Sequence, residues 1–215
     1  AGASELSLRA KALTLQGAAN SSLRNVDLGL HYRPSAEGGT LDVVPLRLTG
    51  RKGVWPTTTA RLDWRREAQQ PASSPLQWRI NSDFLRLDDL GPWAAAFAPA
   101  NKALPAEALS RLRGDITALA ARWQQGIGNA DAHHSLHARF TDLALHWPGH
   151  GSVEGLRGEI SSDDASGRAQ LQGQSLGLEL PRLFAASVHA KRFAADAQWR
   201  REGAAWQLTV PRLAG

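Results

Sequence analysis

The sequence contains no cysteine and no methionine in 215 residues. The lack of cysteine excludes disulfide bonds, thiolate metal sites and thiol nucleophiles. The lack of methionine means that no initiator residue is present, and strand-like alternation begins within the first few residues. We therefore expect residues 1–215 to form a single segment excised from a longer protein.

Long apolar runs are also missing. The longest candidate, residues 92–105 (PWAAAFAPANKALP), is interrupted by prolines and a lysine, whereas a helix that spans a bilayer needs about 20 apolar residues. No signal peptide is visible. Hydrophobic residues make up 42% and charged residues 21% of the chain, which is ordinary for a folded globular protein.

The charge is basic but dispersed. The formal net charge is +5, and 21 of the 25 basic residues are arginine. Most of these arginines occupy the polar positions of predicted strands, for example Arg24, Arg47, Arg61, Arg157 and Arg168. A nucleic-acid surface would gather them on one patch together with stacking aromatic residues. We expect a solvated outer face and no nucleic-acid partner, with contact to anionic lipid headgroups as a weaker alternative.

Alternation of period 2 runs through most of the chain and is clearest at 156–181. Apolar Leu156, Gly158 and Ile160 alternate with polar neighbours, and the cluster DDASG at 163–167 is typical of a turn. After it the apolar residues alternate again, first through Leu171 and then, shifted by one position, from Leu176 onward. This pattern predicts a hairpin of half-buried strands.

The alternation changes phase inside several predicted strands, at 12/13, 43/44, 140/143 and 173/176. Such slips send side chains to the opposite face unless a β-bulge absorbs them, and bulges bend a sheet. We therefore predict a mainly β fold with a long, curled antiparallel sheet.

Pro92 and Pro105 begin Ala-rich runs that predict two short helices near 92–98 and 105–111, a helical insertion at about 90–111.

No motif indicates catalysis or metal binding. His133, His134 and His137 lack the spacing and the second cluster of a zinc site. Residues 150–154 (HGSVE) lack the glycines of a nucleophile elbow, and the acidic pairs at 88–89 and 163–164 suit helix starts and turns. We expect no enzyme activity, no cofactor and no metal.

The eight tryptophans lie mostly at strand ends or on apolar faces. They are consistent with core packing, with stacking on sugar rings, or with the lining of a lipid-holding groove. One-sided strands need a partner layer, so the sheet either closes into a sandwich or leaves its apolar face partly open. The alternation alone does not distinguish these possibilities.

Several strings resemble the YhdP family of the AsmA-like superfamily, which also holds TamB. They are LRGDI at 112–116, FTDLALHWPGHGSVEGLRGEI at 140–160, SGRAQLQGQSLGLELPRLF at 166–184 and RFAADAQWRREGAAWQLTVPRL at 192–213. The resemblance implies a repeating β-groove: a long antiparallel sheet curled into an open groove with an apolar interior. It also implies a periplasmic location, in a full-length protein that is anchored to the inner membrane and bridges to the outer membrane.

The function that this resemblance implies is transport of phospholipid between the two membranes, with acyl chains as the ligand and both membranes contacted by parts outside this segment. The alternatives are a closed β-sandwich scaffold and a sugar-binding envelope module. The candidate groove-lining, lipid-binding residues are Leu143, Leu145, Leu156, Ile160, Leu171, Leu176, Leu178, Leu180, Phe193, Trp199, Trp206 and Leu208.

Overall fold

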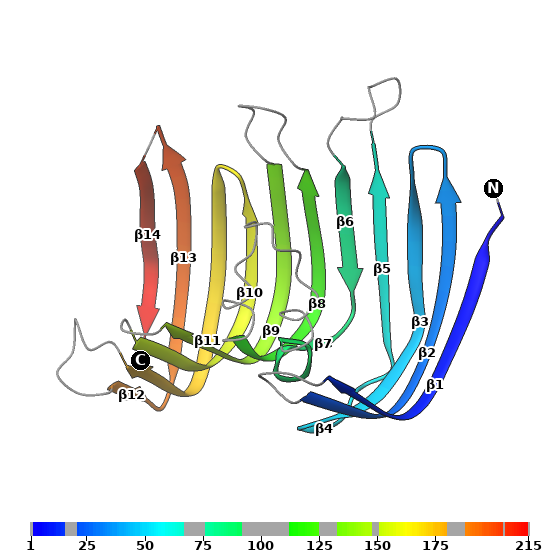
Figure 1. Cartoon of the computed structure of the whole chain (residues 1–215). Coiled ribbons are helices and arrows are strands. Elements are labelled where there is room, and N and C mark those ends of the chain that lie inside the picture. Colours follow the sequence, from blue (N-terminus) through cyan, green and yellow to red (C-terminus); the bar gives the residue numbers. More distant parts are fainter. Residues whose placement is uncertain are drawn as a thin grey trace.

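The chain forms one long antiparallel sheet (Figure 1). The computed structural model describes residues 2–15, 21–66, 76–91, 112–124, 133–147, 151–179, 188–203 and 205–214. The strands are β1 (Ser4–Leu15), β2 (Ser21–Ser35), β3 (Gly38–Gly50), β4 (Gly53–Val54), β5 (Thr58–Arg65), β6 (Gln77–Ser82), β7 (Leu85–Arg86), β8 (Leu112–Gln124), β9 (His133–Trp147), β10 (Gly151–Asp163), β11 (Ser166–Glu179), β12 (Val188–Ala190), β13 (Phe193–Glu202) and β14 (Ala205–Ala214).

The strands follow one another across the sheet almost in chain order. The path is β1-β2-β3-β5-β6-β8-β9-β10-β11-β13-β14, while β4 pairs with β3, β7 with β8 and β12 with β11. The two edges, β1 and β14, lie at opposite ends of this path and do not pair with each other. The prediction of a mainly β antiparallel sheet is confirmed. Because the sheet is open, the alternative of a closed β-sandwich is wrong.

The long strands bend near one end, at the bottom of the view in Figure 1. Pairing registers shift where the sequence changes phase: between Val43 and Leu46 in β3, between Phe140 and Leu143 in β9, and opposite 173–177 in β11. In β9, Asp142 has a positive φ of 52°, which marks the irregular residue. The predicted bulges are therefore confirmed at three of the four slips. At 12/13 the β1–β2 register is continuous, and the irregularity lies instead at Asn25 of β2, which has a φ of 50°.

The hairpin predicted at 156–181 is confirmed in its described part. β10 and β11 pair antiparallel and are joined by a short turn at 164–165. The Asp163 carboxylate accepts hydrogen bonds from the backbone N–H groups of Ala165 (2.9 Å) and Ser166 (2.7 Å). This is the self-capping by aspartate that makes the residue common at turns. These bonds also lower the pKa of Asp163.

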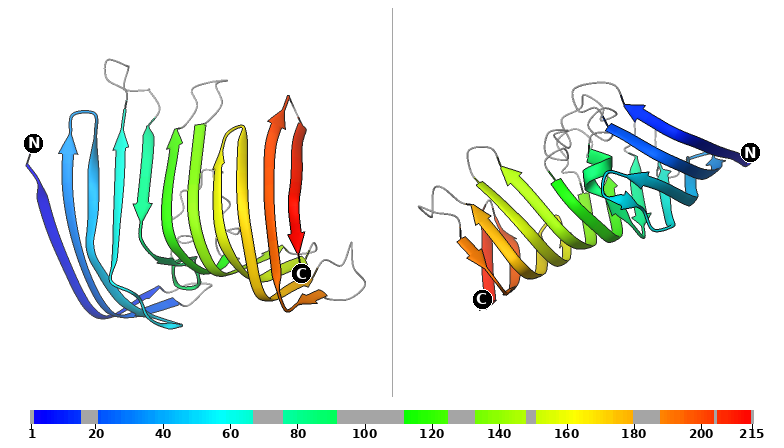
Figure 2. Two further views of the ribbon diagram at one scale, coloured as in Figure 1. Left: turned by 180° about the vertical axis from the view of Figure 1, so that it is seen from behind. Right: turned by 90° about the horizontal axis from the view of Figure 1, so that it is seen from below.

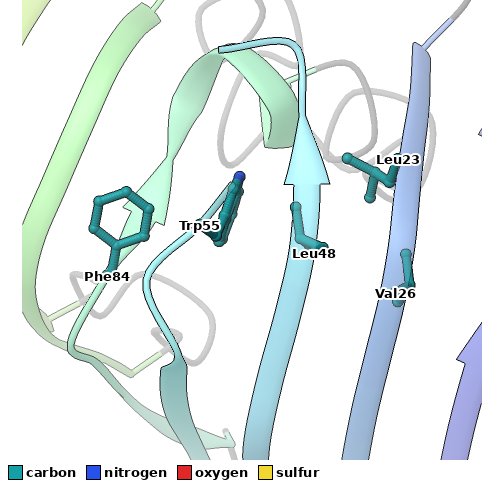
Figure 3. Packing of buried hydrophobic residues seen from close by; sticks show 5 residues of the cluster. All are labelled: Leu23, Val26, Leu48, Trp55 and Phe84. Carbon is teal, nitrogen blue, oxygen red and sulfur yellow. The ribbon is translucent and has the colours of Figure 1, made fainter. Parts of the chain in front are cut away.

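A short helix at 87–91 lies on the inner side of the bend (Figures 1 and 2). The two helices expected near 92–98 and 105–111 fall outside the described residues. The inner side of the bend also holds the main buried cluster, which consists of Leu23, Val26, Leu48, Trp55 and Phe84 (Figure 3). The Trp55 and Phe84 rings meet edge to face, with centroids 5.3 Å apart.

Asp89 fastens the helix to the sheet. Its side chain is 0% exposed and accepts hydrogen bonds from the Trp55 indole N–H and the Arg51 backbone N–H, each at 2.8 Å. Gly50 makes room for this carboxylate, because a Cβ at that position would lie 1.7 Å from Asp89 Oδ2. These contacts attach the helix to the end of β3 and to the chain that follows it.

Asp88 provides the second attachment. It accepts a 2.8 Å hydrogen bond from the Gly114 backbone N–H, and Lys52 Nζ and Arg113 Nη1 lie 3.3 and 3.6 Å from its oxygens. Burial opposes ionisation of this carboxyl, but the Gly114 hydrogen bond and the two cations outweigh it, so the pKa of Asp88 lies below its ordinary value. The carboxylate therefore stabilises the folded state in its charged form.

This pKa shift predicts how the stability depends on pH. A carboxyl with a lowered folded-state pKa stabilises the fold above its unfolded pKa of about 4 and loses that contribution as the pH falls further. We expect Asp88→Asn to lower the melting temperature at pH 7 and to have a shrinking effect below pH 4. Circular dichroism melts from pH 7 to pH 3 measure this, with Glu5→Gln at an exposed position as the control. A difference between wild type and Asp88→Asn that stays constant over this range would contradict it.

Candidate apolar lipid-binding face

The pairing registers divide the sheet into an apolar and a polar face, because residues directly opposite each other on paired strands share a face. One unbroken row on the apolar face is Leu6, Leu30, Val43, Ala60, Ser82, Leu119, Ala138, Ile160, Ala169 and Ala197. The neighbouring row is Tyr32, Leu41, Leu62, Ile80, Ala121, Leu136, Ser162, Gly167, Trp199 and Leu208. The first row runs from β1 to β13 and the second from β2 to β14.

The candidate residues that the structure describes lie on this apolar face. Ile160 and Trp199 belong to the two rows, and Leu208 pairs with Trp199. Closer to the bend, Leu156 pairs with Leu143 and, through Gly173, with Phe193. The remaining members, Leu145, Leu171 and Trp206, occupy the same face two residues away from Leu143, Gly173 and Leu208 along their strands.

Three candidates are not described in full. Leu176 and Leu178 lie in β11, where their backbones pair with Ala190 and Val188 of β12, and their side chains are not described. Leu180 lies outside the described residues. The role of these three leucines stays a prediction.

Much of the apolar face is open to solvent. The side chains of Leu6, Ile80 and Leu208 are 60%, 41% and 67% exposed, and these residues come from β1, the middle of the sheet and β14. Among the described residues, the strands contact mainly the strands with which they pair. Away from the cluster under helix 87–91, no second layer of described structure covers the apolar rows. Exposed apolar surface on this scale is typical of a binding surface.

An aromatic row edges the apolar face at the ends of the strands away from the bend. Trp64, Trp78 and Trp123 are paired in register on β5, β6 and β8, and the Tyr32 ring stacks on Trp64 with centroids 5.8 Å apart. Trp64 and Trp78 also stack, at 5.9 Å. Rings of this type suit a boundary between apolar and wet surroundings. Because stacking occupies both ring faces of Trp64, the row offers a poorer platform for sugars than its tryptophan count suggests.

The N-terminal half of this face was missing from the candidate residues. Leu6, Leu30, Leu62 and Ile80 show the same period-2 alternation as the C-terminal strands, so the sequence contained the signal. The aromatic row was also missed as a unit. Its signal was an aromatic residue near the end of each of several successive strands.

The histidine cluster lies at the end of β9 and is tied to a carboxylate. The Nδ1 atoms of His133 and His134 lie 2.7 and 2.8 Å from the two oxygens of Asp164. Partial burial acts against the charged form of Asp164, but the His134 backbone N–H and the His133 ring outweigh it and lower its pKa. Within the described ranges, no group of three or more His, Asp or Glu residues is arranged to hold a metal ion. No helix in the described part of the chain is long and apolar enough to cross a bilayer.

Comparison with known proteins identifies a family for the chain. The model of the family described as "YhdP protein" matches residues 3–215, which is nearly the whole chain. No curated protein matches. No solved structure matches either.

Proposed function

Because the chain belongs to the YhdP family, we propose that its apolar face carries phospholipid acyl chains as one segment of a bridge between the inner and outer membranes. In this proposal the segment works in the periplasm, and parts of the protein outside it contact the two membranes. No catalytic step is involved, and no cofactor is needed.

The observation that carries the proposal is the pair of continuous, largely apolar rows across an open sheet, each with a single serine, Ser82 or Ser162. An acyl chain binds without directional contacts, and each buried CH₂ group contributes about 0.8 kcal/mol. A continuous row lets an acyl chain move from one strand to the next while the apolar area of protein that it contacts stays nearly constant. The open sheet supports this because a ligand can enter along its whole length.

The first test is direct detection of lipid on the purified chain. We expect native mass spectrometry to show adducts of phospholipid mass, and solvent extraction to recover the same lipids. A phospholipid brominated on its acyl chains should quench tryptophan fluorescence, because Trp64, Trp78, Trp123 and Trp199 occupy the apolar face. A clean apo mass together with no quenching would overturn the proposal.

A further inference from the structure

The polar face of the sheet contains a long depression. Two hollows of about 1050 Å³ and 720 Å³ lie side by side and share Arg79 and Arg122 as lining residues. The first reaches Arg200 on β13 and the second reaches Arg61 on β5. We call this depression the arginine groove. Five of the basic residues that line it are Arg61, Arg79, Arg122, Arg168 and Arg200.

Like charges oppose each other in this groove. Arg79 and Arg122 are directly paired across β6 and β8. On the far side of the larger hollow, Arg168 and Arg200 lie diagonally across β11 and β13, because Arg168 pairs with Gln198 and Arg200 with Ser166. Like charges at opposing positions of a sheet destabilise it. Asp63, which pairs with Arg79 across β5 and β6, offsets part of this repulsion, and an anion bound between the arginines would offset more of it.

The carboxylates that line the groove are already engaged. Asp63 accepts hydrogen bonds from Arg61 and from Thr40 (2.7 Å), and Asp163 caps its own turn. Arg200 is paired with Glu202. Within the part of the chain that the structure describes, Arg79, Arg122 and Arg168 form no close salt bridge, although Asp63 attracts Arg79 and Glu159 attracts Arg168 at longer range. Three guanidinium groups therefore remain available to an external anion.

The floor between the two arginine pairs is small and polar. Ser135 pairs with Arg122, and Ser161 pairs with Arg168, while Gln198 and Gln207 line the far wall. These hydroxyl and amide groups donate to and accept from the hydroxyl groups of a polyol. From β8 to β11 is three strand spacings, about 14 Å. A single small anion does not span this distance, whereas an oligosaccharide with several acidic groups does.

We propose that the arginine groove binds a linear acidic glycan, whose acidic groups contact Arg79, Arg122 and Arg168 and whose hydroxyl groups contact the floor. Arginine suits this role because its planar fork binds carboxylate and sulfate through two parallel hydrogen bonds. The site lies on the face opposite the apolar rows. Binding of lipid and glycan is therefore independent.

The test is calorimetric titration of the chain with a polygalacturonate hexasaccharide and a heparin-derived hexasaccharide, against maltohexaose as the neutral probe. We expect both acidic probes to bind, more weakly as salt rises, and maltohexaose to give no heat. The double variant Arg122→Gln, Arg168→Gln should weaken the binding at least tenfold. The charge-matched control is Arg9→Gln, Arg47→Gln, because both arginines lie outside the groove beside Asp27. It should change the affinity less than twofold.

An equal loss in the two double variants would overturn the proposal, because it would reduce the effect to net charge. Tighter binding of a single-stranded oligothymidylate than of either glycan would also overturn it. Quenching by brominated phospholipid should be the same in all variants. If the chain fails to bind glycan while lipid quenching is normal, only the glycan-site proposal is refuted. If quenching fails while glycan binding is normal, only the lipid proposal is refuted.

Discussion

Ile80→Asp should abolish lipid binding by the chain without unfolding it. Ile80 sits in β6 at the middle of the sheet, between Leu62 and Ala121 in an apolar row, and is 41% exposed. A carboxylate there keeps its water in the free protein, so the fold tolerates it. It interrupts the row that an acyl chain would contact, and burying it under lipid would cost several kcal/mol. We expect lipid adducts and tryptophan quenching to fall at least tenfold, and lipid transport by the full-length protein to stop.

The neighbouring residue supplies a matched control. Asn81 lies on the same strand and points to the polar face, where it pairs with Arg61. Asn81→Asp adds the same charge one residue away and should leave lipid binding unchanged. If both variants bind lipid like the wild type while melting normally, the apolar rows do not carry lipid.

The largest effect on folding should come from Asp89→Ala. The substitution leaves the Trp55 indole N–H and the Arg51 backbone N–H without their acceptor at the inner side of the bend. Leaving buried donors unpaired and opening a small void should lower the free energy of unfolding by about 3 kcal/mol. Urea titration followed by tryptophan fluorescence would measure this, since Trp55 reports on the site directly.

Asp83→Ala isolates the contribution of burial. Asp83 also accepts two hydrogen bonds of 2.8 Å, from the backbone N–H and the hydroxyl of Thr59, but it is exposed. Water replaces the lost acceptor there, so we expect a cost of about 1 kcal/mol. Equal costs for the two variants would show that Asp89 does not fasten the helix.

Sequence periodicity was sufficient to predict the strands but not their attachment to helix 87–91. Alternation is a local signal, and it located the β10–β11 hairpin, its turn at Asp163 and most of the bulges. The contacts of Asp89 join it to residues 34 and 38 positions away, and no local pattern encodes such pairs. Acidic residues at 88–89 were therefore explained as a helix start, which is correct for their position and incomplete for their role.

The apolar character of the candidate face was predictable from the sequence, but only part of the set of strands that form it was. Leu143 shares a face with Leu156 and Ile160 because the bulge at Asp142 restores the phase that the alternation loses between Phe140 and Leu143. The arginine groove had no sequence signal, because Arg79, Arg122 and Arg168 are spread over 90 residues and meet only through the strand order. Their sequence positions are equally typical of a solvated face.

The nearly sequential strand order has a consequence for how such a protein changes in length. Each hairpin touches only its two neighbours, so inserting or deleting one hairpin shifts everything beyond it by two strand spacings, about 10 Å, and leaves the other pairings intact. The number of hairpins therefore sets the length of the sheet. Evolution or design can match it to a required span by counting hairpins, provided that each new one continues the apolar rows.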